Sequence, residues 1–258
     1  MKAFKWLRAG WGFASQPRNV RPFYLLNAAF FLLAGIAAAY FLGAVASILE
    51  GPAALQAALN GAAWMIPLAL FLLLVFFVAH SWLVLAAYHR FAGGRGAFKK
   101  ALTVLPGALL ATAIILVFRG ALESAAGHGF WWEAAGTALS LFVSLAFLLA
   151  VPSYAFRRDL LYAFKESWEL FSREALEVLA FGLGSSVVGA GVLVAGAVAA
   201  VLAALLGLVW PPLFLLSLPL ALVLLSYFAG FAQAFGAGAT AAAYLTLSRK
   251  SFRGRRRA

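Results

Sequence analysis

Few side chains in this sequence of 258 residues could carry chemistry. Cysteine is absent, so disulfides, thiolate metal sites and thiol catalysis are excluded. The single aspartate, Asp159, cannot form the carboxylate pair that an intramembrane aspartyl protease needs. The three histidines, His80, His89 and His128, do not form the His-Glu-x-x-His pattern of a zinc protease, and a Gly-x-x-x-x-Gly-Lys phosphate loop is missing. The sequence therefore predicts no metal, no cofactor and no enzyme activity, although counting alone leaves serine chemistry open.

His80 is the sharpest candidate for chemistry within the apolar sequence. It precedes His89 by nine residues, so at about 1.5 Å per residue it lies roughly 13 Å deeper along a helix. Ionisable groups at such depth usually face the interior of a helix bundle or a water path. His80 and Gln233 are nearly the whole polar inventory expected at mid-membrane, and together they are the candidate intramembrane polar site. Two roles stay open for His80: transport, or a neutral ring hydrogen-bonded to a carbonyl or a serine.

Long apolar segments must position these residues, and the longest runs from Val178 to Ser248. Its seventy-one residues include no Asp, Glu, Lys or Arg, whereas one helical crossing needs only about 20 apolar residues. The whole chain is 65% hydrophobic and 11% charged, with a mean hydropathy of +0.97. Soluble domains average about 45–50% apolar and about 25% charged residues. The sequence therefore predicts an integral membrane protein that crosses the bilayer several times.

Charged residues, glycines and prolines divide the apolar sequence into six expected spans, which gives an all-α transmembrane bundle of three hairpins. The spans are expected at about 22–49, 64–88, 102–122, 134–156, 178–206 and 213–247. No polar linker separates domains, so residues 1–258 are expected to form a single integral membrane domain. Arg119, near the end of the third span, is expected to extend toward the membrane interface.

Each hairpin follows a segment with the pattern of a helix lying on the membrane surface. In residues 2–15 the spacing of Phe4, Leu7, Trp11 and Ala14 predicts one apolar helical face, after which Pro17 and Pro22 are expected to end the helix. In residues 159–177 the predicted apolar stripe and polar side are larger. The stripe comprises Leu161, Phe164, Trp168, Phe171 and Ala175, and the polar side comprises Asp159, Lys165, Glu166, Glu169 and Arg173.

The two segments also match each other at an offset of 157 residues. The matched pairs are Phe4 with Leu161, Leu7 with Phe164, Arg8 with Lys165, Trp11 with Trp168, and Ser15 with Ser172. A weaker third copy, residues 98–105, precedes the middle hairpin. Three duplicated units and convergence on a common surface-helix pattern both explain this similarity.

The glycines of the last hairpin predict close helix packing. Gly182, Gly189 and Gly196 recur every seven residues, while Gly230, Ala234 and Gly238 give a small-xxx-small face. A flexible hinge is the alternative interpretation.

The net charge of +12 lies at the ends of the apolar runs, where it would meet lipid headgroups rather than nucleic acid. The candidate headgroup contacts are Lys2, Lys5, Arg8, Arg157, Arg158, Arg249, Lys250, Arg253, Arg255, Arg256 and Arg257. With six spans, nearly all the basic residues fall on one side, which predicts an inner (plasma) membrane protein with both termini in the cytoplasm. Anionic lipids are the expected partners, together with a membrane protein or a second copy of the chain.

The segment Val151-Pro-Ser-Tyr-Ala-Phe-Arg-Arg-Asp-Leu-Leu-Tyr-Ala-Phe-Lys-Glu-Ser-Trp-Glu-Leu-Phe-Ser-Arg-Glu174, together with Ala9-Gly-Trp-Gly-Phe-Ala-Ser15, resembles a family of prokaryotic six-span membrane proteins without assigned activity. That family is related in layout to the membrane domain attached to some glycerophosphoryl diester phosphodiesterases. The resemblance implies the six-span architecture and supplies no catalytic residues.

Two functions follow from these observations. The leading hypothesis is a non-enzymatic membrane scaffold or accessory protein that engages anionic lipids, because surface helices and basic termini are present and catalytic sets are not. The alternative is a transporter or channel for a small solute or a lipid, supported by His80 and the glycine-rich spans.

Overall fold

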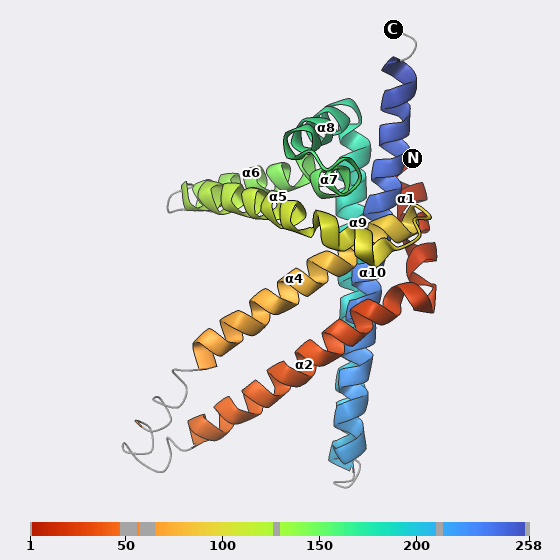
Figure 1. Cartoon of the computed structure of the whole chain (residues 1–258). Coiled ribbons are helices and arrows are strands. Elements are labelled where there is room, and N and C mark those ends of the chain that lie inside the picture. Colours follow the sequence, from red (N-terminus) through yellow and green to blue (C-terminus); the bar gives the residue numbers. More distant parts are fainter. Residues whose placement is uncertain (1, 47–55, 57–64, 126–129, 210–213, 256–258) are drawn as a thin grey trace. The chain divides into compact units, whose positions relative to one another are not determined.

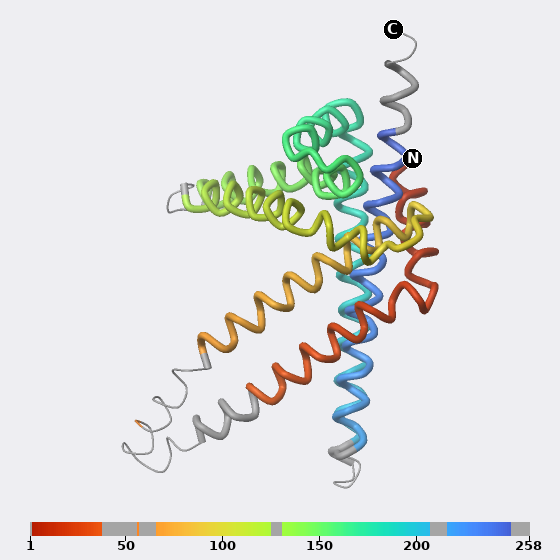
Figure 2. The backbone as a smooth tube through the Cα atoms, viewed as in Figure 1, coloured from red at the N-terminus to blue at the C-terminus, as the bar shows by residue number. Residues whose placement is uncertain are grey.

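The computed structural model describes residues 2–46, 56, 65–125, 130–209 and 214–255. All elements in these ranges are helices (Figure 1), and their backbone path is traced in Figure 2. The helices are α1 (Lys2–Ala14), α2 (Pro17–Ala46), α4 (Met65–Phe91), α5 (Ala97–Ala125), α6 (Phe130–Ala146), α7 (Ala150–Arg157), α8 (Leu160–Arg173), α9 (Ala175–Val209) and α10 (Phe214–Arg255). Residues 53–60, for which the sequence also predicts a short helix, lie outside the described residues apart from Gln56, which is helical.

Six of the described segments are long and apolar enough to cross a bilayer, as the sequence predicted. They are Pro17–Ala37, Ile66–Phe91, Ala97–Ser124, Trp131–Arg157, Ala175–Leu206 and Leu216–Ser248. Between 11% and 33% of each segment's most apolar window is buried inside the protein. Large side chains such as Leu70 and Val187 are 62% and 71% exposed. Exposed apolar surface on this scale is accommodated by lipid and not by water, so the chain is a multi-pass membrane protein.

α1 ends at Ala14 and α2 begins at Pro17, as predicted for a break at Pro17, whereas Pro22 does not end a helix. Pro17 is the first residue of α2, where its missing N–H is not needed. Pro22 lies inside α2, and because it has no N–H, the carbonyl of Arg18 four residues earlier receives no helical hydrogen bond from it. The helix therefore continues, and one carbonyl near its start is left for another donor.

The fourth span is not one continuous helix, contrary to the expectation for residues 134–156. The chain forms turns at residues 147–149, between α6 and α7. Pro152 explains the break, because it cannot donate to the carbonyl of Leu148 and its ring crowds that carbonyl. The last carbonyl of α6, on Ala146, instead accepts a hydrogen bond from the Ser167 hydroxyl of α8 at 2.8 Å.

The middle hairpin also departs from the expected layout of a separate surface helix before each hairpin. α1 and α8 are separate helices, but residues 97–106 are the first turns of α5 itself. Pro106 lies within α5, and the helix continues through it.

The chain divides by its contacts into two compact groups of residues, whose boundaries fall inside α2, α4, α9 and α10. The first group comprises Met1–Val20, Ser81–Gly191 and Phe231–Ala258, and therefore contains all three segments that precede the hairpins. Its buried side chains include Trp6, whose ring meets Phe181 edge-on at 5.7 Å. Glycine brings helices close here, since a Cβ on Gly182 would lie 2.2 Å from Leu145 Cδ2, and one on Gly238 would lie 2.9 Å from Phe13 Cβ.

The second group comprises Arg21–His80 and Val192–Gly230. A Cβ on Gly230 would lie 2.7 Å from the backbone nitrogen of Tyr24, and one on Gly196 would lie 2.4 Å from Phe228 Cβ. These two glycines therefore lie at close helix contacts. Gly189 differs from the predicted seven-residue packing pattern, because a Cβ there would meet no described atom within 4 Å.

Candidate functional site

The three segments that precede the hairpins, residues 4–15, 95–106 and 161–172, share one pattern of burial. We refer to them as the pre-hairpin segments. Trp6, Ala97 and Ala163 occupy matching positions and are all buried, and the agreement extends through six further sets. These are Leu7, Phe98 and Phe164 (half-buried); Arg8, Lys99 and Lys165 (exposed); Gly10, Ala101 and Ser167 (buried); Trp11, Leu102 and Trp168 (exposed); Phe13, Val104 and Leu170 (buried); and Ala14, Leu105 and Phe171 (buried). The segment in α5, which is the weakest match in sequence, therefore agrees with the other two in the packing of its side chains.

The buried faces of α1 and α8 are rotated from the predicted apolar stripes. Phe4 and Leu161, assigned to those stripes, are 70% and 82% exposed. Trp11 and Trp168 are 49% and 47% exposed. The protein-facing side is instead the row that begins at Trp6 in α1 and at Ala163 in α8. The large apolar residues of the stripes are therefore mostly directed away from the protein core.

Each pre-hairpin segment packs on the second helix of another hairpin. α8 contacts α6 and α7, and the first turns of α5 contact α4, where Trp82 Nε1 donates to the Phe98 carbonyl at 3.0 Å. α1 packs on α10, the last helix of the chain. A Cβ on Gly10 would lie 2.5 Å from Ala239 Cβ, so the two backbones are in close contact. The first segment thus occupies the place at the last hairpin that α8 occupies at the middle one.

The pre-hairpin segments differ most at one position, which is Ala9 in α1, Lys100 in α5 and Glu166 in α8. Glu166, predicted on the polar side, is only 5% exposed. Its Oε2 accepts hydrogen bonds from the Ser153 hydroxyl of α7 and, at 2.9 Å, from the Tyr244 hydroxyl of α10. A carboxylate can be buried when such donors replace water.

A cation and aromatic rings complete the surroundings of Glu166. Arg157 NH2 lies 3.9 Å from Glu166 Oε1, and its guanidinium lies over the ring of Tyr162 at 5.6 Å. Phe156 stacks on Tyr244 with ring centroids 5.6 Å apart. The local chain fits this arrangement, since Arg158 adopts a left-handed conformation with φ 62° and the Asp159 carboxylate caps α8 by accepting from the Tyr162 N–H at 2.9 Å.

The matching position in α5 holds an exposed cation, Lys100. A Cβ on Gly94 would lie 2.9 Å from the His89 carbonyl oxygen and 3.7 Å from Lys100 Nζ, which places the ammonium beside the turn after α4. His89 is 9% exposed, and its Nε2 is buried without a hydrogen-bond partner among the described residues. Arg158 donates to Thr103 Oγ1 of α5 at 3.2 Å. The second copy therefore gathers cations where the third has a carboxylate.

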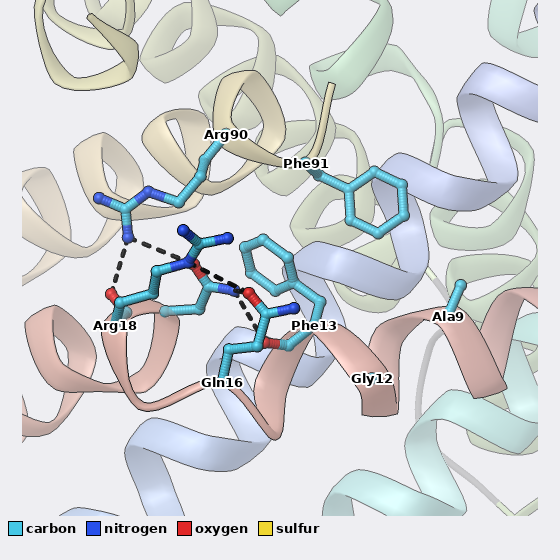
Figure 3. A pocket seen from close by; sticks show the side chains of 8 residues that line it. Ala9, Gly12, Phe13, Gln16, Arg18, Arg90 and Phe91 are labelled. Atoms are coloured by element: carbon cyan, nitrogen blue, oxygen red, sulfur yellow. Dashed lines mark hydrogen bonds between the residues drawn. The ribbon is translucent and has the colours of Figure 1, made fainter. Parts of the chain in front are cut away.

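The position of Ala9 in α1 is open. Ala9 lines a cavity of about 400 Å³, whose other lining residues include Gln16, Arg18, Asn19 and Arg90 (Figure 3). No aspartate or glutamate lines this cavity among the described residues. Ala9 also lines a second cavity of about 580 Å³. The first copy thus has space and basic side chains where the third copy has Glu166.

Arg90 is held in the first cavity by the carbonyl that Pro22 leaves unpaired. Its NH1 donates to the Arg18 carbonyl at 2.7 Å and to Asn19 Oδ1 at 3.3 Å (Figure 3). Asn19, which is buried, donates in turn to the Phe13 carbonyl at 2.9 Å. The Arg90 guanidinium also lies over the Phe98 ring at 5.0 Å. These contacts fix a cation in the last turn of α4.

The second cavity includes two of the predicted headgroup contacts, Lys2 and Lys5. Lys2 forms an ion pair with Glu174, and the Ala3 N–H donates to Glu177 Oε2 at 2.9 Å, so two carboxylates hold the amino-terminal turn of α1. Lys5 is exposed. Of the two, Lys5 is therefore the one without a carboxylate partner in the described part of the chain.

The remaining predicted headgroup contacts are divided among three settings. Arg8 is exposed and Arg158 contacts α5 as described, whereas Arg157 is engaged with the buried Glu166. The side chains of the carboxyl-terminal group, Arg249, Lys250, Arg253, Arg255, Arg256 and Arg257, lie outside the described residues.

The two members of the predicted intramembrane polar site belong to different helix groups. His80, in the second group, is half-buried between the rings of Phe23 and Phe76, each with its centroid 6.1 Å away. Its Nδ1 is buried and has no hydrogen-bond partner among the described residues. Gln233, in the first group, is half-buried on α10. The surroundings of His80 are aromatic, and no described carboxylate or second histidine lies against its ring.

Arg119 forms a polar cluster that the sequence did not predict. Its Nε donates to Ser140 Oγ at 3.0 Å, and that hydroxyl donates to Glu123 Oε1 at 2.7 Å, which links α5 to α6. Arg119 therefore binds a neighbouring helix, and its extension toward the membrane interface stays a prediction. No group of three potential metal ligands occurs in the described part of the chain.

Comparisons of this chain with protein-family models, with curated proteins and with solved structures find no match. The resemblance to six-span prokaryotic membrane proteins stays a prediction, and the function has to be argued from the geometry.

Proposed function

We propose that the protein is a non-enzymatic scaffold or accessory protein of the membrane that engages anionic lipids. One observation carries this proposal: in each pre-hairpin segment an exposed basic residue lies three residues before an exposed large apolar residue. The pairs are Arg8 with Trp11, Lys99 with Leu102, and Lys165 with Trp168. A spacing of three residues places both side chains on adjoining parts of one helix surface.

This combination suits the boundary between headgroups and acyl chains. Apolar side chains can enter the acyl region there while basic side chains meet anionic phosphates. Attraction to an anionic leaflet is worth about 1 kcal/mol for each lysine or arginine near its surface. Three such sites in one protein give an affinity for anionic lipid that depends strongly on salt.

The test measures lipid bound to the purified protein by native mass spectrometry, with phosphatidylglycerol and phosphatidylcholine compared at equal concentration. We expect preferential retention of phosphatidylglycerol, which the triple variant Arg8→Gln, Lys99→Gln, Lys165→Gln weakens. The matched control Arg8→Lys, Lys99→Arg, Lys165→Arg keeps every charge and should behave as the parent. Equal retention of both lipids by the parent protein would exclude the proposal.

We also propose the inner (plasma) membrane as the location, with both termini in the cytoplasm. The support is the distribution of Lys and Arg, which a six-span topology places almost entirely on one side. Because cysteine is absent, single cysteines at Ser15, Gly127 and Ser251 can be probed in whole cells with a membrane-impermeant thiol reagent. Labelling at Gly127 alone is expected, and labelling at Ser251 would contradict this orientation.

A transporter or channel is the second candidate, and the unpartnered Nδ1 of His80 is the observation that favours it. A buried imidazole nitrogen without a partner is costly unless a ligand or water reaches it. In liposomes, His80→Ala should then abolish a pH-dependent flux while leaving the protein folded. A variant with unchanged flux and lower thermal stability would assign His80 a structural role.

A further inference from the structure

We propose that the cavity beside Ala9 binds a phosphate group, at the place where the third pre-hairpin segment holds its own carboxylate, Glu166. This inference rests on the proposed engagement of anionic lipids and names the site at which one phosphate is held. The ligating side chains are Arg18 and Arg90, with Lys5 at the adjoining cavity.

Ala9 in α1 and Glu166 in α8 occupy equivalent positions. Ala9 and Glu166 lie 157 residues apart, at the offset that also relates the buried and exposed positions of α1 and α8. The hydroxyls at Ser15 and Ser172 follow the same offset, and each donates to the carbonyl of the tryptophan one turn earlier at 2.8 Å. A side chain longer than alanine at position 9 would therefore extend where Ala9 now borders the two cavities.

The surroundings of Glu166 and Ala9 differ in their balance of charge. Around Glu166 the positive charge of Arg157 is balanced by the buried carboxylate. Around Ala9 the guanidinium groups of Arg18 and Arg90 act on each other as like charges, and no described carboxylate lies beside them. An anion in this cavity would relieve that repulsion and form charge-assisted hydrogen bonds.

Phosphate is the anion that fits these donors. Arginine presents its donors in a planar fork that fits phosphate oxygens, and one fork here is already fixed by the Arg18 carbonyl and Asn19. The cavity of about 400 Å³ is far larger than the ~30 Å³ occupied by one water molecule. Arg18 and Arg90 also lie near the ends of the spans Pro17–Ala37 and Ile66–Phe91, where long basic side chains can extend to lipid headgroups. The chemistry is that of a phosphate ester, carried by a lipid headgroup or by a free phosphate.

The experiment follows thermal unfolding of the full-length protein in a nonionic detergent as short-chain phosphatidylglycerol, short-chain phosphatidylcholine or inorganic phosphate is added. We expect phosphatidylglycerol to raise the midpoint of the parent protein. Arg90→Gln and, separately, Arg18→Gln should weaken this binding by about tenfold or more. Arg18 is exposed, so its variant tests the site even where Arg90→Gln lowers the yield of folded protein.

The decisive variant is Ala9→Glu, with Ala9→Gln as its neutral control of the same size. Glutamate at position 9 should raise the midpoint without lipid and remove most of the response to phosphatidylglycerol, as an internal anion would. Glutamine should leave more of that response. An Ala9→Glu variant that responds to phosphatidylglycerol as the parent does, together with unaffected arginine variants, would overturn the site.

Comparing the two lipids and inorganic phosphate separates failure of this site from failure of the proposed function on which it rests. A parent protein that responds equally to phosphatidylglycerol and phosphatidylcholine would exclude anionic-lipid engagement altogether. A selective response that survives Arg18→Gln, Arg90→Gln and Ala9→Glu would keep the function and exclude this site. A response to inorganic phosphate alone would support the phosphate site and exclude the lipid as its source.

Discussion

α1 and α8 are the two regions of this molecule that most resemble each other, yet they differ in the contacts made at one matching position, Ala9 in α1 and Glu166 in α8. Both bury a row of small and apolar side chains and expose a tryptophan of nearly equal accessibility, 49% for Trp11 and 47% for Trp168. α8 buries Glu166 among donors from α7 and α10, whereas α1 has Ala9 beside two cavities with basic walls.

The difference shows how one helix pattern can serve packing in one copy and leave room for a ligand in another. In α8 the polar position is satisfied within the protein, so the segment is fastened to two other helices. In α1 the polar contacts lie at the two ends instead, in the Lys2–Glu174 ion pair at its start and the buried Asn19 after its end. The surface of α1 at Ala9 remains accessible because alanine adds almost no volume.

The largest expected effect is that of removing the carboxylate from α8. Glu166→Ala should lower the free energy of unfolding by about 3–5 kcal/mol, because it leaves Arg157 without its anion and two buried hydroxyls without an acceptor. Lys165→Ala, at an exposed neighbouring position, is the control and should change stability by less than about 0.5 kcal/mol. Chemical denaturation in detergent gives both values, and equal values would contradict the role assigned to Glu166.

A second prediction concerns the close contact of α1 with α10. Gly10→Ala places a Cβ 2.5 Å from Ala239 Cβ and 2.8 Å from the Phe235 carbonyl oxygen, so the helices must move apart at a cost of about 1–3 kcal/mol. Gly12→Ala, where a Cβ meets no described atom within 4 Å, should instead stabilise the helix by about 0.5–1 kcal/mol. Thermal midpoints that shift in the same direction for both variants would refute the contact.

A third prediction compares the small buried residue of each segment. Ser167 donates to the Ala146 carbonyl at the end of α6, so Ser167→Ala should cost about 1 kcal/mol by leaving that carbonyl unpaired. The matching Ala101 has no hydroxyl, and Ala101→Gly should act only through helix propensity and a lost methyl contact. Hydrogen exchange at the α6–α7 break should rise in Ser167→Ala and stay unchanged in Ala101→Gly.

The smallest expected effect tests whether the carboxyl-terminal ends of α1 and α8 are equivalent. Ser15→Ala and Ser172→Ala each remove an exposed hydroxyl that donates to a tryptophan carbonyl at 2.8 Å. Both changes should alter the free energy of unfolding by less than about 0.5 kcal/mol and by equal amounts. Different values, measured under the same conditions, would show that the two helix ends are not equivalent.

The spans were predictable because each depends only on local composition over about 20 residues. The break after α6 was missed because Pro152 lies in an apolar run, where hydrophobicity alone gives no sign of a turn. The burial of Glu166 was missed for a different reason. Its partner Tyr244 lies 78 residues away, and helical periodicity cannot report a contact between distant helices.

The candidate site had the same difficulty, since Arg90 and the carbonyl of Arg18 are 72 residues apart. A usable signal was nevertheless present. Aligning the three pre-hairpin segments places Ala9, Lys100 and Glu166 in one column, where the residue is neutral, basic or acidic although a basic residue precedes it and a small residue follows it in all three. The variable column in a repeated pattern marks the position at which the copies have different partners.

The packing of α1 against α10 also sets an order of events during biosynthesis. Gly10 is made before Ala239, its contact, which follows 229 residues later in the chain. At about 5–20 residues per second, the ribosome needs on the order of ten to fifty seconds to reach that partner. Throughout that interval α1 lacks its final neighbour, so its contact with α10 forms only after the last hairpin has been made. Truncation before α10 should therefore leave α1 accessible to protease in nascent chains, and completion of α10 should protect it.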